Sequence, residues 1–280
     1  MDYKYTELDY AKKIYEEGFQ SDKHRPTELR LLATYMRRVL NYKPKKLREE
    51  LDKWCNSHIP GYRRELYYKL LNSAITKACA KGSTLINIEQ VDFYRYEMDY
   101  IDSLMITGEY AYHCRKLLFT LLFKEKVNRM ITKSKSADAD LKYQGKYFQG
   151  GKRKYTELKK LAKLTEKIKI NEDIIHTLWK HQLVTPLHNG LLRLDYLQPF
   201  YKFQEQDATL DKSVVLQIRD YDSIGWYYDY YHGENRIRFC ECCGKIFRKR
   251  SNKEIYCSEE CKKHIKNEKD KEYYKNKSTI

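Results

Sequence analysis

Apolar residues recur at intervals of three and four along the first third of the chain, which is the spacing of amphipathic helices. One such stripe, within residues 27–42, consists of Leu29, Leu32, Ala33, Met36 and Leu40. The pattern predicts four helices, over residues 6–19, 27–42, 44–56 and 62–80. Prolines at positions 26, 44 and 60 stand at or just before three of the helix starts, where proline is favoured. We therefore expect a small helical bundle over residues 1–82.

The middle of the chain changes from helical spacing to short apolar runs separated by turn residues. Its helices are expected over residues 109–131, 155–164 and 171–181, with Asn171 as the cap of the last one. The two apolar runs at 183–187 and 191–197, joined by His188-Asn189-Gly190, predict a β-hairpin. Residues 142–154, rich in lysine and glycine, are expected to form an exposed loop or strand. This order of elements is typical of a winged helix-turn-helix domain, here over residues 83–200.

The second helix of this motif does not suit a DNA groove, although such a helix normally enters the major groove. It begins with Glu172 and Asp173, which would face phosphates badly and which the helix dipole favours at a helix start. Basic residues precede it instead, at Lys152, Arg153 and Lys154. Two interpretations stay open: the preceding loop and helix contact phosphates, or the domain is a scaffold for protein contacts.

Residues 201–235 are expected to link this domain to the end of the chain and to pack against both. Residues 213–218 resemble a strand, and residues 226–231 form an aromatic cluster. Aromatic side chains can stack on unpaired bases. Four aspartates precede the cluster, however, so a packing surface between domains is the favoured interpretation.

Cysteine pairs dominate the last segment, residues 236–280. Cys240 and Cys243 are separated by two residues, Cys257 and Cys261 by three, with thirteen residues between the pairs. Four thiolates in this arrangement can hold one structural Zn²⁺ in a tetrahedron. Gly244 gives the first pair the backbone freedom of a tight turn. The sequence then predicts a strand over residues 245–247, a basic hairpin loop, a return at residues 255–256 and a helix capped by Ser258, which is a treble-clef zinc finger.

The ligand set leaves one alternative open. Cys242 is a fifth thiol, and His264 lies about one turn beyond Cys261, so that His264 can replace Cys261. Cys240, Cys243, Cys257 and Cys261 are preferred, because a two-residue gap followed by glycine suits a metal-binding turn. Four thiolates leave no open position for water, so the zinc is expected to be structural and not catalytic.

The motif Cys-x2-Cys-Gly-Lys-x-Phe followed by Tyr-Cys-Ser-x2-Cys and a lysine-rich helix resembles the treble-clef fingers of the CGNR type. The resemblance covers residues 236–274. It departs from the family after Cys261, where Lys262, Lys263 and His264 stand in place of its name-giving residues. Similar fingers end many proteins of Firmicutes bacteria and their phages. The resemblance implies nucleic-acid binding and an origin in a phage or other mobile element.

Charge supports a polyanionic partner. The net charge of the chain is +16, although an AT-rich genome alone would enrich lysine. The distribution is more informative: residues 115–169 carry 17 basic and five acidic side chains, residues 170–236 carry six and ten, and residues 241–280 carry 12 and seven. The expected phosphate contacts are Arg248, Lys249 and Arg250 in the finger loop, Lys262, Lys263 and Lys266 on the finger helix, and Lys152, Arg153 and Lys154.

The sequence contains no catalytic constellation that we recognise. It lacks a glycine-rich phosphate loop, a Gly-x-Ser-x-Gly elbow and a histidine between Lys245 and Tyr256, so no enzymatic activity is expected. Isolated cysteines (Cys55, Cys79 and Cys114), the absence of a signal peptide and the absence of a long apolar run predict a cytoplasmic protein.

Two functions remain. The first is a zinc-containing nucleic-acid-binding or regulatory factor, with DNA favoured over RNA. The second is an accessory or inhibitory protein that binds a host protein or a nucleoprotein complex, such as a defence system.

Overall fold

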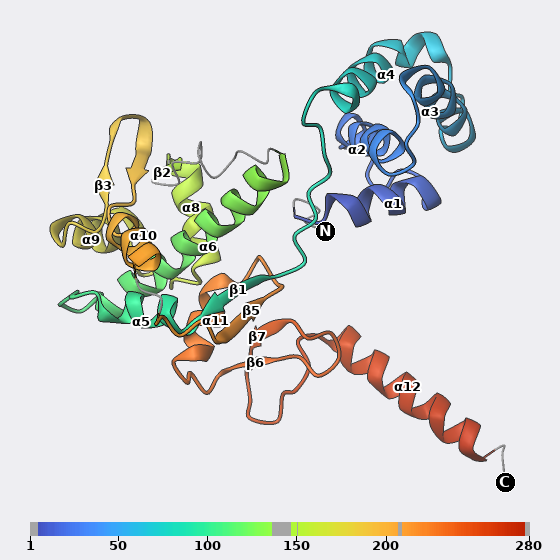
Figure 1. The fold of residues 1–280 in the computed structure, drawn as a ribbon. Coiled ribbons are helices and arrows are strands. Elements are labelled where there is room, and N and C mark those ends of the chain that lie inside the picture. The colour runs from blue at the N-terminus through green and yellow to red at the C-terminus, as the bar shows by residue number, and fades with distance from the viewer. Residues whose placement is uncertain (1–4, 136–146, 150, 207–208, 278–280) are drawn as a thin grey trace. The chain divides into compact units, whose positions relative to one another are not determined.

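The computed structural model describes residues 5–135, 147–149, 151–206 and 209–277. The described chain is mainly helical with small antiparallel sheets, as expected (Figure 1). It divides into two compact units, residues 1–89 with 127–143 and residues 90–126 with 144–280. No helix among the described residues is both long enough and apolar enough to span a membrane.

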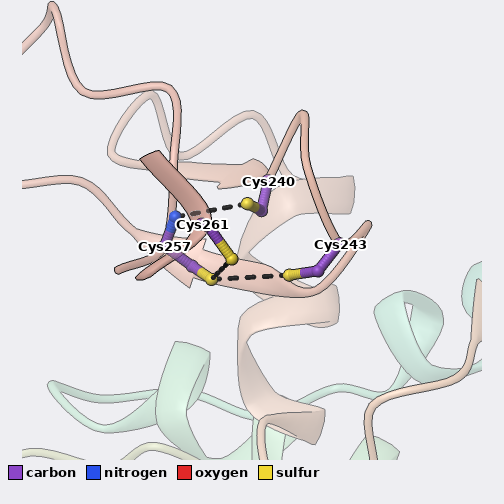
Figure 2. Close-up of side chains that lie close together, drawn as sticks. All are labelled: Cys240, Cys243, Cys257 and Cys261. Carbon is purple, nitrogen blue, oxygen red and sulfur yellow. Dashed lines mark hydrogen bonds between the residues drawn. The ribbon is translucent and has the colours of Figure 1, made fainter. Parts of the chain in front are cut away.

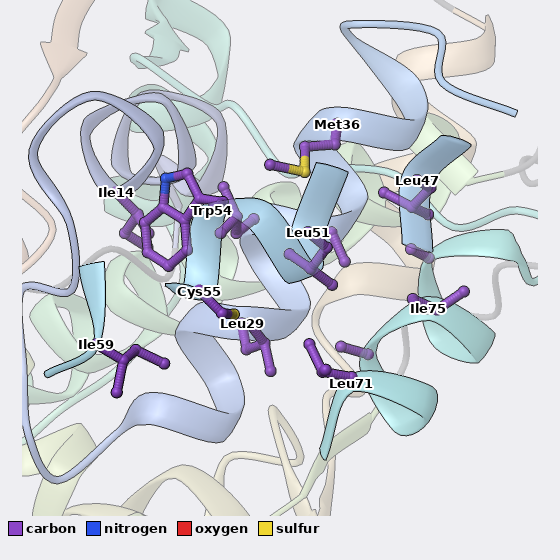
Figure 3. Close-up of a cluster of buried hydrophobic side chains, with 14 residues drawn as sticks. Ile14, Leu29, Met36, Leu47, Leu51, Trp54, Cys55, Ile59, Leu71 and Ile75 are labelled. Carbon is purple, nitrogen blue, oxygen red and sulfur yellow. The ribbon is translucent and has the colours of Figure 1, made fainter. Parts of the chain in front are cut away.

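The first unit contains the four predicted helices. They are α1 (Glu7–Glu17), α2 (Arg25–Arg38), α3 (Pro44–His58) and α4 (Arg64–Cys79). Four residues of the predicted α2 stripe are at most 3% exposed, and Leu40 packs partly against them. Figure 3 shows the core that they form with residues of the other helices, among them Ile14, Leu51, Trp54 and Ile75. Burial of this apolar stripe, at roughly 25 cal/mol per Å², is what makes these helices stable.

The second unit is built from helices and three small sheets. Its first elements are β1 (Val91–Tyr94), α5 (Arg95–Ser103), α6 (Ala111–Lys135), β2 (Tyr147–Gln149), α8 (Lys152–Leu161), the π-helix η1 (Ile170–Ile175) and α9 (His176–Lys180). The following elements are β3 (Thr185–Pro186), η2 (His188–Gly190), β4 (Leu191–Arg193), α10 (Leu197–Gln206), β5 (Val214–Ile218), α11 (Ile224–Tyr231), β6 (Ile237–Phe239), β7 (Ile246–Arg248) and α12 (Glu259–Lys277). α6 spans the division between the two units at residue 126.

The predicted hairpin and strand are present, and both have partners that the sequence did not reveal. β3 and β4 pair antiparallel, and β2 pairs with the other edge of β4. β2 lies within the predicted lysine- and glycine-rich loop, but the end of that loop needs correction, because residues 152–154 are the first turn of α8. Residues 142–146 and 150 lie outside the described residues. β5 pairs antiparallel with β1, more than a hundred residues earlier in the chain. Such distant pairing leaves no local sequence signal.

The predicted helix at residues 171–181 needs correction. Residues 170–175 form a π-helix, and only residues 176–180 are α-helical. Asn171 is not the cap, because Lys169 precedes the first helical residue. Asp173 fills the helix-start role expected for it, since its carboxylate accepts a hydrogen bond from the backbone N–H of Lys169 at 2.7 Å. The side chain that satisfies the free backbone N–H therefore comes from inside the first turn.

α11 is held against α6 and α8 by a close backbone approach and a buried ion pair. A Cβ atom at Gly225 would lie 1.9 Å from the carbonyl oxygen of Ala162, directly after α8. Lys116 Nζ lies 2.6 Å from Asp229 Oδ2, and Tyr112 donates a hydrogen bond to Asp229 Oδ1 at 2.7 Å. Burial lowers the pKa of Lys116, and the carboxylate of Asp229 opposes that change. These contacts fix the position of α11 within the second unit.

Candidate metal centre and basic groove

The first cysteine pair lies on a tight turn between β6 and β7. Cys240 donates its backbone N–H to the carbonyl of Lys245, and Gly244 donates to the carbonyl of Cys240, both at 2.9 Å. Gly244 has a φ of +69°, as its predicted role in the turn requires. The turn directs the side chains of Cys240 and Cys243 toward the start of α12 (Figure 2).

The predicted hairpin is corrected, because β7 pairs with β6 and not with residues 255–256. Ile237, Arg238 and Phe239 face Arg248, Phe247 and Ile246. The return segment contributes only the carbonyl of Ile255, which accepts a hydrogen bond from Glu241 N–H at 3.2 Å. Residues 249–254 instead form a loop that leads from the end of β7 toward α12. The hairpin therefore encloses the cysteine turn; Arg248 is the last residue of β7, and Lys249 and Arg250 follow it at the open end.

The second cysteine pair lies at the start of α12. Ser258 caps this helix as predicted, because its Oγ accepts a hydrogen bond from the backbone N–H of Cys261 at 3.3 Å. Glu259 and Glu260 occupy the first turn, where the helix dipole favours carboxylates. The cap places Cys257 just before the helix and Cys261 inside its first turn, so that both thiols face the same side.

The four predicted ligands converge on one point. Their Sγ atoms all lie within 4.8 Å of one another. Cys257 Sγ lies 3.5 Å from Cys243 Sγ and 3.6 Å from Cys261 Sγ (Figure 2). A tetrahedral zinc–thiolate site with bonds near 2.3 Å has sulfur–sulfur edges of about 3.8 Å. The cluster is therefore of the right size for one metal ion and is compatible with zinc.

Electrostatics in the cluster favour binding of a cation. Burial by itself would raise the pKa of Cys240, but backbone N–H groups of Cys243, Cys257 and Cys242 lower it to about 6. One of these donors, Cys257 N, lies 3.3 Å from Cys240 Sγ. Burial and then the neighbouring thiols raise the pKa of Cys257. Four thiolates at this spacing repel one another, and a divalent cation at their centre removes that repulsion.

Cys242 and His264 lie outside this group. Cys242 Sγ is 3.9 Å from His264 Nδ1, so the fifth thiol and the histidine are neighbours. Among the described histidine, cysteine and acidic residues, the group that can hold a metal contains Cys261 and not His264. The structure thus favours Cys261 in the alternative that the sequence left open.

The finger is docked on α11 through aromatic side chains. The ring centroid of Phe239 lies 4.9 Å from that of Tyr230 and 5.8 Å from that of Tyr227. Tyr227 and Tyr228 are each 1% exposed. Tyr227 and Tyr228 of the predicted aromatic cluster are therefore packing residues, which agrees for these two with the favoured interpretation of the sequence. Trp226 and Tyr231 are only partly buried, and Tyr230 is 44% exposed.

The predicted phosphate contacts fall into two classes. Arg153 and Lys154 on α8 both form ion pairs with Glu157, and Lys262 on α12 pairs with Glu259 at 3.7 Å. Nothing is described for the side chain of Lys152. Lys263 and Lys266 are exposed on α12. Like Lys263 and Lys266, Arg248, Lys249 and Arg250 form no ion pair within 4.0 Å in the described part of the chain.

These three residues line a groove of about 690 Å³ at the open end of the β6–β7 hairpin. The other residues that line it are Trp226, Arg236, Ser251 and Asn252. The positions of Arg236 and Trp226 at this groove were not predicted from the sequence. The helical spacing could have indicated the position of Trp226. It comes one residue before Tyr227 and Tyr228, which are buried, and so lies beside the buried stripe of α11. The groove is thus lined by four cations and one indole.

The chain matches no family model, no curated protein and no solved structure. The resemblance of residues 236–274 to CGNR-type fingers therefore stays a prediction from the motif.

Proposed function

We propose that this chain is a nucleic-acid-binding protein, in which a zinc-built treble-clef finger presents cations to phosphates. The observation that supports this most is the groove at the finger loop. Arg236, Arg248, Lys249 and Arg250 line it, and none of the four forms an ion pair with a described residue. Surface cations usually have carboxylates nearby, as Arg153 and Lys154 do. Four uncompensated cations around one groove suit a polyanion, because phosphates would replace the missing acidic partners.

The metal would have a structural part in this function. Holding the cysteine turn, the loop and the start of α12 together fixes where the cations stand, and four thiolates leave no position for a metal-bound water. We therefore propose a non-enzymatic, cytoplasmic binding or regulatory factor of a phage or mobile element, with DNA favoured over RNA.

The winged-helix interpretation of residues 83–200 also belongs to this proposal. α8, η1 with α9, and the hairpin β3–β4 follow one another as helix, helix and wing would, while β2, which pairs with β4, precedes α8 in the chain. The ion pairs of Arg153 and Lys154 with Glu157 reduce their availability for phosphates. We assign this region a secondary contact at most, and the finger the primary one.

The test is the salt dependence of DNA binding by the variant R248E/K249E/R250E. The slope of log K against log salt concentration is about −0.9 per phosphate contact on duplex DNA. Losing three contacts should flatten the slope by roughly 2 to 3 and weaken binding to all sequences alike. The measurement is fluorescence anisotropy with a labelled 20-base-pair duplex at several salt concentrations.

A matched control changes the net charge equally in the helical bundle. Lys12, Lys13 and Lys53 each lie beside a glutamate on the same helix, and K12E/K13E/K53E makes the same change in total charge. This control should keep most of the salt slope. If both triple variants flatten the slope equally, net charge and not the finger loop determines binding, and the proposed interface is wrong.

A protein-binding accessory function remains the second candidate. Leu66 and Leu70 lie one turn apart on α4, with exposures of 73% and 37%, and Tyr68 between them is 54% exposed. Exposed apolar side chains on one helix suit a protein partner better than a phosphate backbone. If the purified protein shows no salt-dependent DNA or RNA binding, protein binding becomes the better-supported function.

A further inference from the structure

The indole of Trp226 lies beside the buried stripe of α11 and not within it. In α11 the helical spacing places Ile224, Tyr227 and Tyr228 in the interior, where each is at most 1% exposed. Trp226 lies outside this buried stripe, is partly exposed and lines the basic groove. The exposed part of this large aromatic side chain lies at the groove, where it is available to a ligand.

The position of Trp226 is nevertheless well fixed. Its backbone N–H donates to the carbonyl of Ser223 at 3.0 Å, and the neighbouring Gly225 is pressed against the carbonyl of Ala162. Lys163 Nζ lies 4.5 Å from the centroid of the indole ring. The ring is therefore held on a rigid backbone, with a cation over it that comes from the end of α8.

The cations of the groove come from the ends of the two finger strands. The backbone N–H of Lys249 donates to the carbonyl of Arg236 at 2.8 Å, so the ladder of β6 and β7 continues up to the groove. This hydrogen bond fixes the backbone of Arg236 beside that of Lys249. Cations at the ends of two different strands could thus contact the phosphates on either side of a nucleotide. The indole of Trp226 lines the same groove.

We infer that this groove binds an unpaired nucleotide, with the base stacked on Trp226 and the flanking phosphates on Arg236, Arg248, Lys249 and Arg250. This inference rests on the proposed nucleic-acid-binding function and names the form of nucleic acid that the site prefers. Only a single strand, a bulge or an end exposes the face of a base, whereas a duplex offers the groove its phosphates alone. Stacking tolerates every base, so the preference concerns strandedness and not sequence.

The experiment compares the parent with W226A, W226F and the matched control W179A. Trp179 lies on α9, is 51% exposed and does not line the groove. The probes are a mixed-sequence 12-nucleotide DNA strand, the RNA of the same sequence and the DNA duplex of the same length. Zinc content and melting temperature establish that each variant is folded like the parent.

W226A should weaken binding of both single strands about tenfold or more and leave duplex binding within about twofold. W226F should retain most of the single-strand affinity, and W179A should lose far less of it than W226A does. A larger loss for RNA than for DNA, or the reverse, would identify the preferred source of the unpaired nucleotide and would support the inference in either case.

The opposite results separate this inference from the proposed function. If W226A binds single strands as the parent does, or loses duplex and single-strand binding equally, the stacking site is wrong while the basic interface stands. If the parent binds neither single strands nor duplex, the proposed function fails and this inference fails with it.

Discussion

At the residue scale, the metal ligands were the part of the site that the sequence predicted best. The two cysteine spacings, Gly244 and Ser258 each have a local physical reason, and a ligand set drawn from one short segment needs little knowledge of the rest of the fold. Arg236 and Trp226 were missed because their importance depends on which residues meet across the groove. That meeting is set by the docking of the finger on α11, which no local pattern encodes.

Single cysteine substitutions test the ligand set. C243S and C257S should each abolish stoichiometric zinc binding and unfold the finger, because metal binding and folding are coupled in so small a module. C242S and H264A should keep about one zinc per chain. Metal analysis of the purified variants, together with hydrogen exchange of residues 236–271, measures both effects. Zinc lost from C242S or H264A but kept in C261S would show that the ligand set is wrong.

The buried ion pair gives a second prediction at this scale. D229N should destabilise the protein by about 3 to 5 kcal/mol, because it leaves the Lys116 ammonium buried without its partner. The double variant K116M/D229N should recover most of that loss, since it removes the charge and keeps an acceptor for Tyr112. Urea unfolding measures both. E268Q, which breaks an exposed pair with Lys271, should change stability by less than about 1 kcal/mol. If the double variant is no more stable than D229N, burial of the charge is not the cause.

At the element scale, the helices of the bundle were predicted well, whereas α5, α10, α11 and most strand pairings were missed. Periodicity over ten or more residues is a strong signal, and all four helices of the bundle follow it. Strands of three to five residues carry little alternation, so the pairing of β6 with β7 and of β1 with β5 was not found. The start of η1 was placed wrongly because a capping residue inside the first turn, Asp173, competes with the more usual one before it.

The packing of α11 predicts that replacing a helical glycine by alanine lowers the stability of this protein, which is opposite to the usual effect. Replacing glycine by alanine inside a helix ordinarily stabilises it by about 0.5 to 1 kcal/mol. G225A should instead destabilise the protein by about 1 to 3 kcal/mol, because the added Cβ would lie 1.9 Å from the carbonyl oxygen of Ala162. Chemical unfolding monitored by circular dichroism gives the sign. A stabilised G225A variant would mean that α11 does not approach α8 as described.

The two sets of predicted phosphate contacts also differ at this scale. Neutralising Lys152, Arg153 and Lys154 on α8 should flatten the salt slope of binding less than the finger-loop triple variant does, since Arg153 and Lys154 already pair with Glu157. The same anisotropy titration measures both variants. An equal or larger effect of the α8 substitutions would make the winged-helix region the primary contact and the finger secondary.

At the scale of the whole molecule, an excess of basic residues and the predicted metal ligands lie in the same segment, residues 236–280. The net charge of +16 indicated a polyanion without saying where it would bind. We propose the groove as this place, because its four cations form no ion pair with a described residue. Formation of the groove depends on the cysteine turn. The turn connects β6 to β7, and the groove lies where these two strands and the following loop meet. The proposed nucleic-acid binding should therefore require the metal.

Nucleic-acid affinity measured in one titration with and without zinc tests this link most directly. The zinc-loaded protein should bind a labelled oligonucleotide with a steep salt dependence. Removing the metal with a chelator should weaken binding and flatten the slope, and adding back one equivalent of zinc should restore both. A metal-free protein that binds with the same affinity and the same slope would contradict the account, because the finger would then not be the interface.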